Sequence, residues 1–166
     1  MPDVQVMGGD LGGTAIKVAR IRADGTVMAE AQCPTAQPAV PGVVTMALCE
    51  EIEQIDPGHA AQAVGVGLPG PMDAAARVAR VCINLPGWED VPLADWLESR
   101  LNRRVTLAND GNCAVVGEAW LGAARGVDDV VLLTLGTGVG GGVLLRGELF
   151  TGHNGACLLY TSDAAD

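Results

Sequence analysis

An acid and a glycine pair, in the segment Asp10-Leu-Gly-Gly-Thr14, follow directly after a short apolar run near the start of the chain. Glycine has no Cβ, so the backbone N–H groups around Gly12 and Gly13 can approach phosphate oxygens closely, and the Thr14 hydroxyl adds another donor. A carboxylate such as Asp10 suits a hydrated Mg²⁺. The segment therefore predicts a phosphate-binding turn, although a glycine pair between two strands also fits an ordinary hairpin.

A second glycine cluster, Leu135-Gly-Thr-Gly-Val-Gly-Gly-Gly142, again follows an apolar run. Two such turns can grip one polyphosphate from opposite sides. The cluster superficially fits the GxGxxG pattern of dinucleotide-binding proteins, but that pattern needs a helix next, and Val143–Leu145 indicates a strand. We therefore favour a second phosphate turn.

The charge of the chain limits its partners. The formal net charge is −10, with a single lysine, Lys17, and arginines dispersed along the sequence. No basic face is available to neutralise a nucleic-acid backbone, so we expect no nucleic-acid partner. Lys17, close to the first glycine turn, is a candidate phosphate contact, and a solvated lysine at a strand end is the alternative.

Polar turn residues also follow other predicted strands. The segment Asn109-Asp-Gly-Asn112 lies between a strand and a helix, so the Asp110 carboxylate should be exposed at the start of that helix. A simple helix cap is the alternative role for Asp110. Asn84 and Gly70 each come after a predicted strand too, and polar groups at strand ends converge on one cleft. This convergence favours a functional role for Asp110.

Hydrophobic periodicity and turn residues predict the elements that must position these groups. The expected strands, of which the first three form an antiparallel meander, are Val4–Met7, Ala15–Ile21, Val27–Gln32, Ala63–Leu68, Arg77–Ile83, Val105–Ala108, Val130–Leu135 and Val143–Leu145. For Arg77–Ile83 a hairpin is the alternative to a single strand. The expected helices are Gly42–Ile55, Pro92–Leu101 and Asn112–Leu121. A meander followed by alternating helices and strands indicates an α/β protein that forms half of a two-lobed nucleotide-binding fold.

Composition agrees with a folded α/β domain. The 166 residues are 49% hydrophobic but only 3% aromatic, so small aliphatic side chains must fill the core. Five cysteines without a CxxC pair argue against a disulfide framework and a zinc ribbon, and we expect them to be reduced and mostly buried. Because the sequence shows neither a signal peptide nor a run of about 18 apolar residues, we expect a cytoplasmic protein with no membrane partner.

Taken in order, the motifs resemble the ROK family of repressors, open reading frames and sugar kinases, and most closely its bacterial glucokinases. The resemblance covers residues 4–156. It is carried by Asp10-Leu-Gly-Gly-Thr14, Gly67-Leu-Pro-Gly-Pro71, Asn84-Leu-Pro-Gly-Trp88, Asn109-Asp-Gly-Asn-Cys-Ala114 with Gly117-Glu118, and Leu135-Gly-Thr-Gly-Val-Gly-Gly-Gly142. It implies an α/β fold of the actin and hexokinase type (ASKHA, ribonuclease H-like).

The resemblance also implies a reaction, the ATP-dependent phosphorylation of a hexose, with glucose converted to glucose 6-phosphate. Asp110 would be the general base that takes the proton of the attacking sugar hydroxyl. The sugar would be held by Gly70, Asn84, Asn109 and Asp110. Asp10 would lie near Mg²⁺ and contact it indirectly. The phosphates of ATP would be held by Gly12, Gly13, Thr14 and Lys17 on one side and by Gly136, Thr137, Gly138 and Gly140 on the other.

The resemblance stops at Ala156. Family members continue with a Gly-Glu-x-Gly-His segment, whose glutamate binds the sugar and whose histidine contributes to sugar contacts and to a structural zinc site. This chain instead reads Cys157-Leu-Leu-Tyr-Thr-Ser-Asp-Ala-Ala-Asp166, without the glutamate, the histidine or the later zinc segment, and His153 does not replace them. We interpret residues 157–166 as foreign sequence joined to a truncated reading frame, the alternative being a natural disordered end.

The expected domains are an N-terminal lobe over residues 1–122, the start of an incomplete second lobe over residues 123–156, and the non-family tail over residues 157–166. A chain truncated in this way should be inactive, and it should expose apolar surface along Val130–Leu145. The full-length protein is expected to be a homodimer, as ROK kinases commonly are.

Two other functions are possible for the same motifs. A sugar-sensing regulator would place these lobes behind a DNA-binding helix-turn-helix, but the first strand begins by Val4 and the acidic charge offers no substitute for that module. A non-catalytic fragment would keep sugar or phosphate contacts without transferring phosphate.

Overall fold

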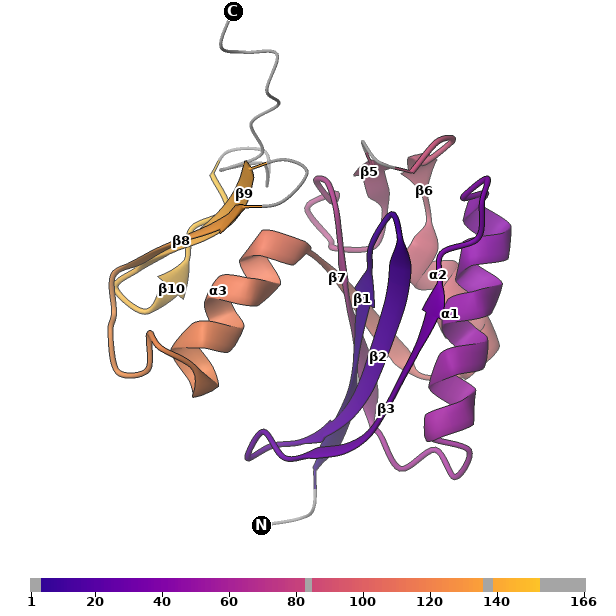
Figure 1. The fold of residues 1–166 in the computed structure, drawn as a ribbon, viewed down its shortest axis with the longest axis horizontal. Helices are drawn as coiled ribbons and strands as arrows, with labels where there is room; N and C mark the ends of the chain where they lie inside the picture. Colours follow the sequence, from indigo (N-terminus) through magenta and orange to yellow (C-terminus); the bar gives the residue numbers. More distant parts are fainter. Residues whose placement is uncertain (1–3, 83–84, 136–138, 153–166) are drawn as a thin grey trace, which may run out of the picture. The chain divides into compact units, whose positions relative to one another are not determined.

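The computed structural model describes residues 4–82, 85–135 and 139–152 of the chain (Figure 1). These residues divide into two compact units, Met1–Ala108 and Asn109–Asp166, each with its own sheet. Several sequence predictions fall outside the described residues and stay predictions. They concern Asn84, Gly136, Thr137, Gly138 and the tail over residues 157–166.

Unit 1 is built on a mixed five-stranded sheet with the strand order β3-β2-β1-β4-β7. Its strands are β1 (Gln5–Leu11), β2 (Ala15–Arg22), β3 (Val27–Pro34), β4 (Ala63–Leu68) and β7 (Arg104–Asn109). The first three form the predicted antiparallel meander, and β4 pairs parallel with β1. Short turns suffice between antiparallel strands, whereas the parallel strand is reached only after a helix.

Two helices, α1 (Pro41–Ile55) and α2 (Leu93–Leu101), pack together on the sheet of unit 1 (Figure 1). Proline suits the first turn of α1 because its fixed φ is already helical and it has no N–H to satisfy. Side chains alternate across each strand, so that Met7 and Leu11 of β1 are buried in the core while Asp10 between them is exposed. This alternation places Asp10, with Lys17 opposite it in register, on the face of the sheet away from α1.

Between β4 and α2 the chain forms a short antiparallel hairpin of β5 (Ala79–Val81) and β6 (Glu89–Val91). Trp88 anchors it, since its side chain is 2% exposed and its indole Nε1 donates a 2.8 Å hydrogen bond to the carbonyl oxygen of Ala39. The sequence predicts a strand or a hairpin over Arg77–Ile83 and misses β6, because two acidic residues open that strand and acidic residues are uncommon in strands.

Unit 2 consists of α3 (Asp110–Leu121) packed on an antiparallel sheet of order β10-β9-β8. Its strands are β8 (Val130–Leu135), β9 (Val139–Leu145) and β10 (Glu148–Leu149). The helix lies directly on the β9 backbone: a Cβ on Gly111 would be 2.4 Å from the carbonyl oxygen of Gly141. A Cβ on Gly142 would be 2.5 Å from the Val115 side chain. Only glycine fits at these two positions.

The lobe boundary predicted after residue 122 stays a prediction. In the structure the chain divides into its two compact units between Ala108 and Asn109, because α3 packs against β8 and β9 and so belongs to unit 2. Apolar surface expected along Val130–Leu145 is present on β8, where Val131, Leu133 and Leu135 are 68%, 61% and 80% exposed. These three residues are spaced two apart along the strand, so they share one of its faces.

Four of the five cysteines, Cys33, Cys49, Cys82 and Cys113, lie in the described part of the chain. Cys49 and Cys82 are buried as expected, whereas Cys113 on α3 is exposed. Burial raises the pKa of Cys49 to about 11, which disfavours its reactive thiolate. Within residues 4–82, 85–135 and 139–152, none of the helices combines the length and the hydropathy that a membrane crossing requires.

Candidate active site

The first glycine turn is the tip of the β1–β2 hairpin. The N–H of Gly12 donates a 3.0 Å hydrogen bond to the carbonyl oxygen of Ala15, so the hairpin geometry considered from the sequence is present. It does not exclude phosphate binding, because exposed polar residues surround the tip. Asp10 and Lys17 are paired in register on the two strands and both are exposed, as is Thr14 between the strands.

The segment after β3 braces this turn. The Thr35 hydroxyl donates a 2.7 Å hydrogen bond to the carbonyl oxygen of Gly12, and the Thr35 N–H donates one of 2.9 Å to that of Thr14. The Gln37 side chain donates from Nε2 to the carbonyl oxygen of Gly13 at 3.1 Å. Sequence reasoning missed both residues, since 23 positions separate Thr35 from Gly12 and only the pairing of β2 with β3 joins them.

Gly70 occupies a turn that only glycine can form. Its φ is +122°, and a Cβ there would lie 1.9 Å from the carbonyl oxygen of Val81. The turn is held against the β5 strand by a 3.0 Å hydrogen bond from the N–H of Arg80 to the carbonyl oxygen of Pro71. The structure thus gives Gly70 a clear backbone role, and its predicted contact with sugar stays a prediction.

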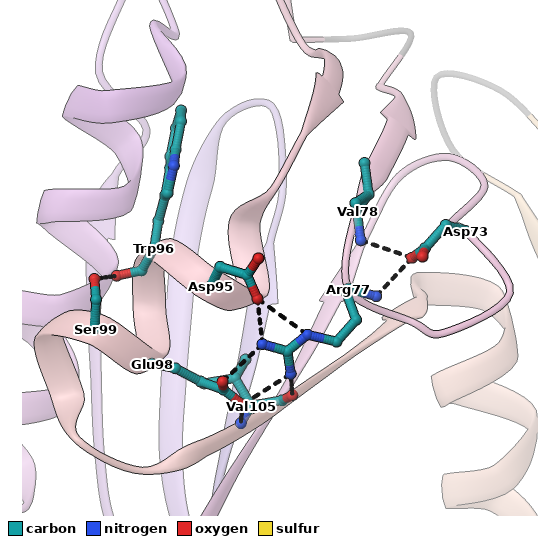
Figure 2. Close-up of polar contacts among 8 residues, drawn as sticks. All are labelled: Asp73, Arg77, Val78, Asp95, Trp96, Glu98, Ser99 and Val105. Carbon is teal, nitrogen blue, oxygen red and sulfur yellow. Dashed lines mark hydrogen bonds and ion pairs between the residues drawn. The ribbon is translucent and has the colours of Figure 1, made fainter.

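Figure 2 shows a network of ion pairs around Arg77, whose guanidinium lies between Asp95 and Glu98 of α2. Arg77 also donates a 3.3 Å hydrogen bond to the carbonyl oxygen of Val105 in β7, and the N–H of Val105 donates to Glu98 at 2.8 Å. Hydrogen bonds from Arg77 and from the Val105 N–H lower the pKa of Glu98 to about 2. The network therefore joins three segments of unit 1.

The Asp73 carboxylate extends this network toward the Gly70 turn. Its Oδ1 accepts hydrogen bonds from the N–H groups of Arg77 at 2.6 Å and Val78 at 2.7 Å (Figure 2). These bonds lower the pKa of Asp73, the Val78 bond being the largest cause. The chain between β4 and β5 is consequently fixed from within and does not form a loose loop. Asp73 and Arg77 were not among the residues predicted from the sequence, because an isolated charged residue in a turn belongs to no recognisable motif.

Asp110 is the first residue of α3 and is exposed. The helix cap is Asn109, whose Oδ1 accepts a 3.2 Å hydrogen bond from the N–H of Asn112. Asp110 is therefore not the cap that the alternative interpretation required. Its Oδ1 accepts hydrogen bonds from Nδ2 of Asn109 at 3.0 Å and from the N–H of Gly111 at 2.7 Å. Both bonds reach the same oxygen and fix the orientation of the carboxylate.

The described glycines of the second cluster lie in strand β9. Strand β9 begins at Val139, so Gly140 lies within the strand, opposite Thr134 of β8. A Cβ on Gly140 would be 2.8 Å from the Thr134 hydroxyl, which explains the glycine there. Unit 2 thus holds Asp110, Asn109 and Gly140, while unit 1 holds Gly70 and the first glycine turn.

The residues present fit a magnesium nucleotide. Mg²⁺ keeps several waters and is bound through one or two carboxylates together with phosphates, so a single exposed carboxylate such as Asp10 is a sufficient donor. A Cβ on Gly12 would approach the carbonyl oxygen of Ala15 to 3.1 Å. Because glycine has no side chain, the backbone at the tip of the hairpin is not covered at this position. Phosphate oxygens could therefore approach its backbone N–H groups closely.

Comparison with known proteins agrees with this geometry. The described elements define an α/β nucleotide-binding fold of the actin and hexokinase type. The chain belongs to the ROK family, whose model matches residues 6–157. This confirms the resemblance drawn from the motifs and the fold class that it implied.

Several relatives of the chain are named as sugar kinases. Over 155 residues the chain is 41% identical to a glucokinase of Thermotoga maritima, with 93% of this chain and 49% of the relative covered. It is 34% identical over 165 residues to an N-acetyl-D-glucosamine kinase of Pectobacterium atrosepticum, with 96% and 54% covered. The crystal structure of a ROK family glucokinase from Streptomyces griseus in complex with glucose and AMPPNP matches with a TM-score of 0.87 and 32% identity, covering 93% of this chain and 48% of that one. The chain spans about half the length of the relatives it matches.

Proposed function

We propose that this chain is part of an ATP-dependent hexose kinase that converts glucose to glucose 6-phosphate. The observation that carries the proposal is the carboxylate of Asp110, exposed at the start of α3 and oriented by two hydrogen bonds to its Oδ1. An oriented carboxylate with its other oxygen accessible is what a general base needs. The glucokinase of Thermotoga maritima, at 41% identity, supports glucose as the sugar.

In this proposal Asp110 takes the proton of the attacking sugar hydroxyl at Oδ2. Asn109 keeps the carboxylate in place through Nδ2, and its own side chain is anchored because its Oδ1 caps α3. Asn109, Gly70 and Asn84 would hold the remaining hydroxyls of the sugar. A positioned base contributes about 10²–10⁴-fold to the rate, so positioning and exclusion of water must provide the rest.

Bound Mg-ATP would supply the phosphoryl group to be transferred. The first glycine turn would hold its phosphates through the N–H groups around Gly12 and Gly13 and through the Thr14 hydroxyl. Asp10 would orient the hydrated Mg²⁺, and Lys17, opposite it in register, would add positive charge. Gly136, Thr137, Gly138 and Gly140 would contact the phosphates from unit 2. We further propose that the full-length enzyme is cytoplasmic and that it is a homodimer.

The decisive experiment uses the protein completed to the length of its relatives. Asp110→Asn should lower kcat for glucose by about 10²–10⁴-fold in a coupled ADP-release assay, because the amide cannot accept the proton. The hydrogen bonds at Oδ1 can be kept by the amide oxygen, so the midpoint of urea unfolding should stay close to that of the wild type. Wild-type turnover by Asp110→Asn would refute the role of Asp110.

The sugar is tested in the same assay by comparing kcat/KM for glucose, mannose and N-acetyl-D-glucosamine. We expect glucose to be the best substrate. A preference for N-acetyl-D-glucosamine, the substrate named for the relative at 34% identity, would keep the kinase proposal and replace its sugar.

A further inference from the structure

We propose that Thr35 is a positioning residue for the first glycine turn, which it holds in the orientation that presents backbone N–H groups to phosphate. The inference rests on the proposed function, because it assigns a support to the same phosphate site. Thr35 is not part of the turn itself and lies 23 positions after Gly12 in the sequence.

Three successive carbonyl groups of the turn, those of Gly12, Gly13 and Thr14, accept hydrogen bonds from the segment after β3. In a trans peptide the carbonyl of one residue and the N–H of the next point in opposite directions. The N–H groups of Gly13 and Thr14 therefore point away from that segment. Successive N–H groups presented on one side form the concavity that binds anions.

Such an orientation must be imposed from outside the turn. Glycine populates both signs of φ with little difference in energy, so the peptide between Gly12 and Gly13 could rotate and present its carbonyl oxygen to the ligand. A carbonyl oxygen facing a phosphate would repel it. The hydrogen bond from the Thr35 hydroxyl, at 2.7 Å, holds that oxygen on the opposite side.

Thr35 is suited to this task by its burial and its place in the sheet. Its side chain is 4% exposed, so water cannot easily replace its hydroxyl as the partner of Gly12. Pro34 pairs with Ala15 across β2 and β3, which brings Thr35 to the base of the turn. The backbone of Thr35 adds a second bond, to the carbonyl oxygen of Thr14 at 2.9 Å.

The test compares Thr35→Val, which removes the hydroxyl at nearly constant volume, with Thr35→Ser, which keeps it. The matched control is Thr45→Val, because Thr45 is a buried threonine of α1 whose hydroxyl also donates to a backbone carbonyl, that of Pro41, at 2.7 Å. In the protein completed to the relatives' length, the Kd for Mg-AMPPNP is measured by calorimetry, and KM for ATP and for glucose by steady-state kinetics.

We expect Thr35→Val to raise the Kd for Mg-AMPPNP and the KM for ATP about 5- to 20-fold, while KM for glucose changes less than about twofold. Thr35→Ser should restore most of the nucleotide affinity, and Thr45→Val should leave it unchanged. Equal losses in nucleotide and glucose affinity, or equal effects of Thr35→Val and Thr45→Val, would overturn the proposal.

A second readout separates this proposal from the kinase assignment. Amide hydrogen exchange of Gly13 and Thr14 is followed in the 166-residue chain without nucleotide, where Thr35→Val should change exchange at the turn and Thr45→Val should not. If the completed protein phosphorylated no hexose, the proposed function would fail, and the exchange result would still decide whether Thr35 orders the turn. Unchanged exchange in Thr35→Val overturns the positioning role.

Discussion

A Cβ atom on Gly70 would lie 1.9 Å from the carbonyl oxygen of Val81, inside the contact distance of any two heavy atoms. The turn between β4 and β5 is therefore packed directly against the backbone of β5, with no room for a side chain between them. This relationship explains the glycine without reference to a ligand, and it makes the turn a rigid part of unit 1.

Gly70→Ala should destabilise the chain by about 2–4 kcal/mol, because the new methyl group clashes and the positive φ is strained. The measurement is urea unfolding followed by circular dichroism. Gly126→Ala is the control: its φ is also positive, at +79°, but a Cβ there meets nothing within 4 Å. It should show only the strain, about 1 kcal/mol. Equal effects of the two substitutions would mean that the clash at Val81 is relieved without cost.

Asp56→Asn tests a buried charge cluster away from the candidate site. The Asp56 side chain is fully buried and accepts hydrogen bonds from Arg20 at 3.0 Å and from Arg103. Burial alone would raise the pKa of Asp56, but hydrogen bonds from the N–H groups of Ala61 and Ala60 and from the arginines lower it. Loss of the charge leaves two arginines unmatched, and stability should fall by about 3–5 kcal/mol.

The control for this substitution is Asp90→Asn. Asp90 pairs with Arg80 at 2.7 Å on the exposed surface, where solvent screening makes an ion pair contribute little to stability. Thermal unfolding of both variants at neutral pH makes the comparison. If Asp56→Asn were as stable as Asp90→Asn, the cluster would not hold the C-terminal end of α1.

Stability should fall in acid in a way that depends on Glu98. Its pKa is about 2 in the folded chain, below its ordinary value of 4.5, so its contribution to stability is fully present above about pH 4.5. That contribution is lost as the pH falls toward 2 and the carboxylate in the Arg77 network is protonated. Glu98→Gln should therefore remove part of the slope of stability against pH between about 4.5 and 2.

The measurement is urea unfolding at a series of pH values from 2 to 7, chosen to span that range. Glu53→Gln, which changes an exposed glutamate of α1, is the control and should retain the wild-type slope. A slope unaltered by Glu98→Gln would show that the ion pairs of Figure 2 do not contribute to acid sensitivity.

Gly111→Ala tests the contact between α3 and β9. Alanine normally stabilises a helix interior relative to glycine by about 1 kcal/mol. At Gly111 the sign should reverse, because a Cβ would lie 2.4 Å from the carbonyl oxygen of Gly141. Gly117→Ala in the same helix is the control, since a Cβ there meets nothing within 4 Å. Denaturant midpoints should fall for Gly111→Ala and rise for Gly117→Ala; a rise for both would contradict the close packing.

Sequence patterns predicted most of the elements because periodicity reports burial. The strands Ala63–Leu68 and Val130–Leu135 agree with β4 and β8, and the helix expected from Gly42 begins one residue earlier, at Pro41. Strand β9 was predicted too short. After Val139 it continues with three glycines, Gly140 to Gly142, which carry no side-chain signal, and their extended conformation is imposed by pairing with β8.

The candidate site was less predictable than the elements. Asp110 and the first glycine turn could be singled out, because a carboxylate or a glycine pair after a strand has a recognisable pattern. Thr35 and Arg77 could not, since their roles arise from hydrogen bonds to backbone groups that are distant in the sequence. The assignment of the helix cap to Asn109 also needed the backbone, because Asn109 and Asp110 are both good caps.

The contact of Gly111 with Gly141 has a mechanical consequence for the proposed enzyme. It joins the first turn of α3, where Asp110 lies, to the strand that carries Gly140. The distance from Asp110 to Gly140 is thus fixed by the packing of α3 on β9 inside unit 2. Whatever relation the two units adopt during a catalytic cycle, the base and the second phosphate strand would keep their spacing.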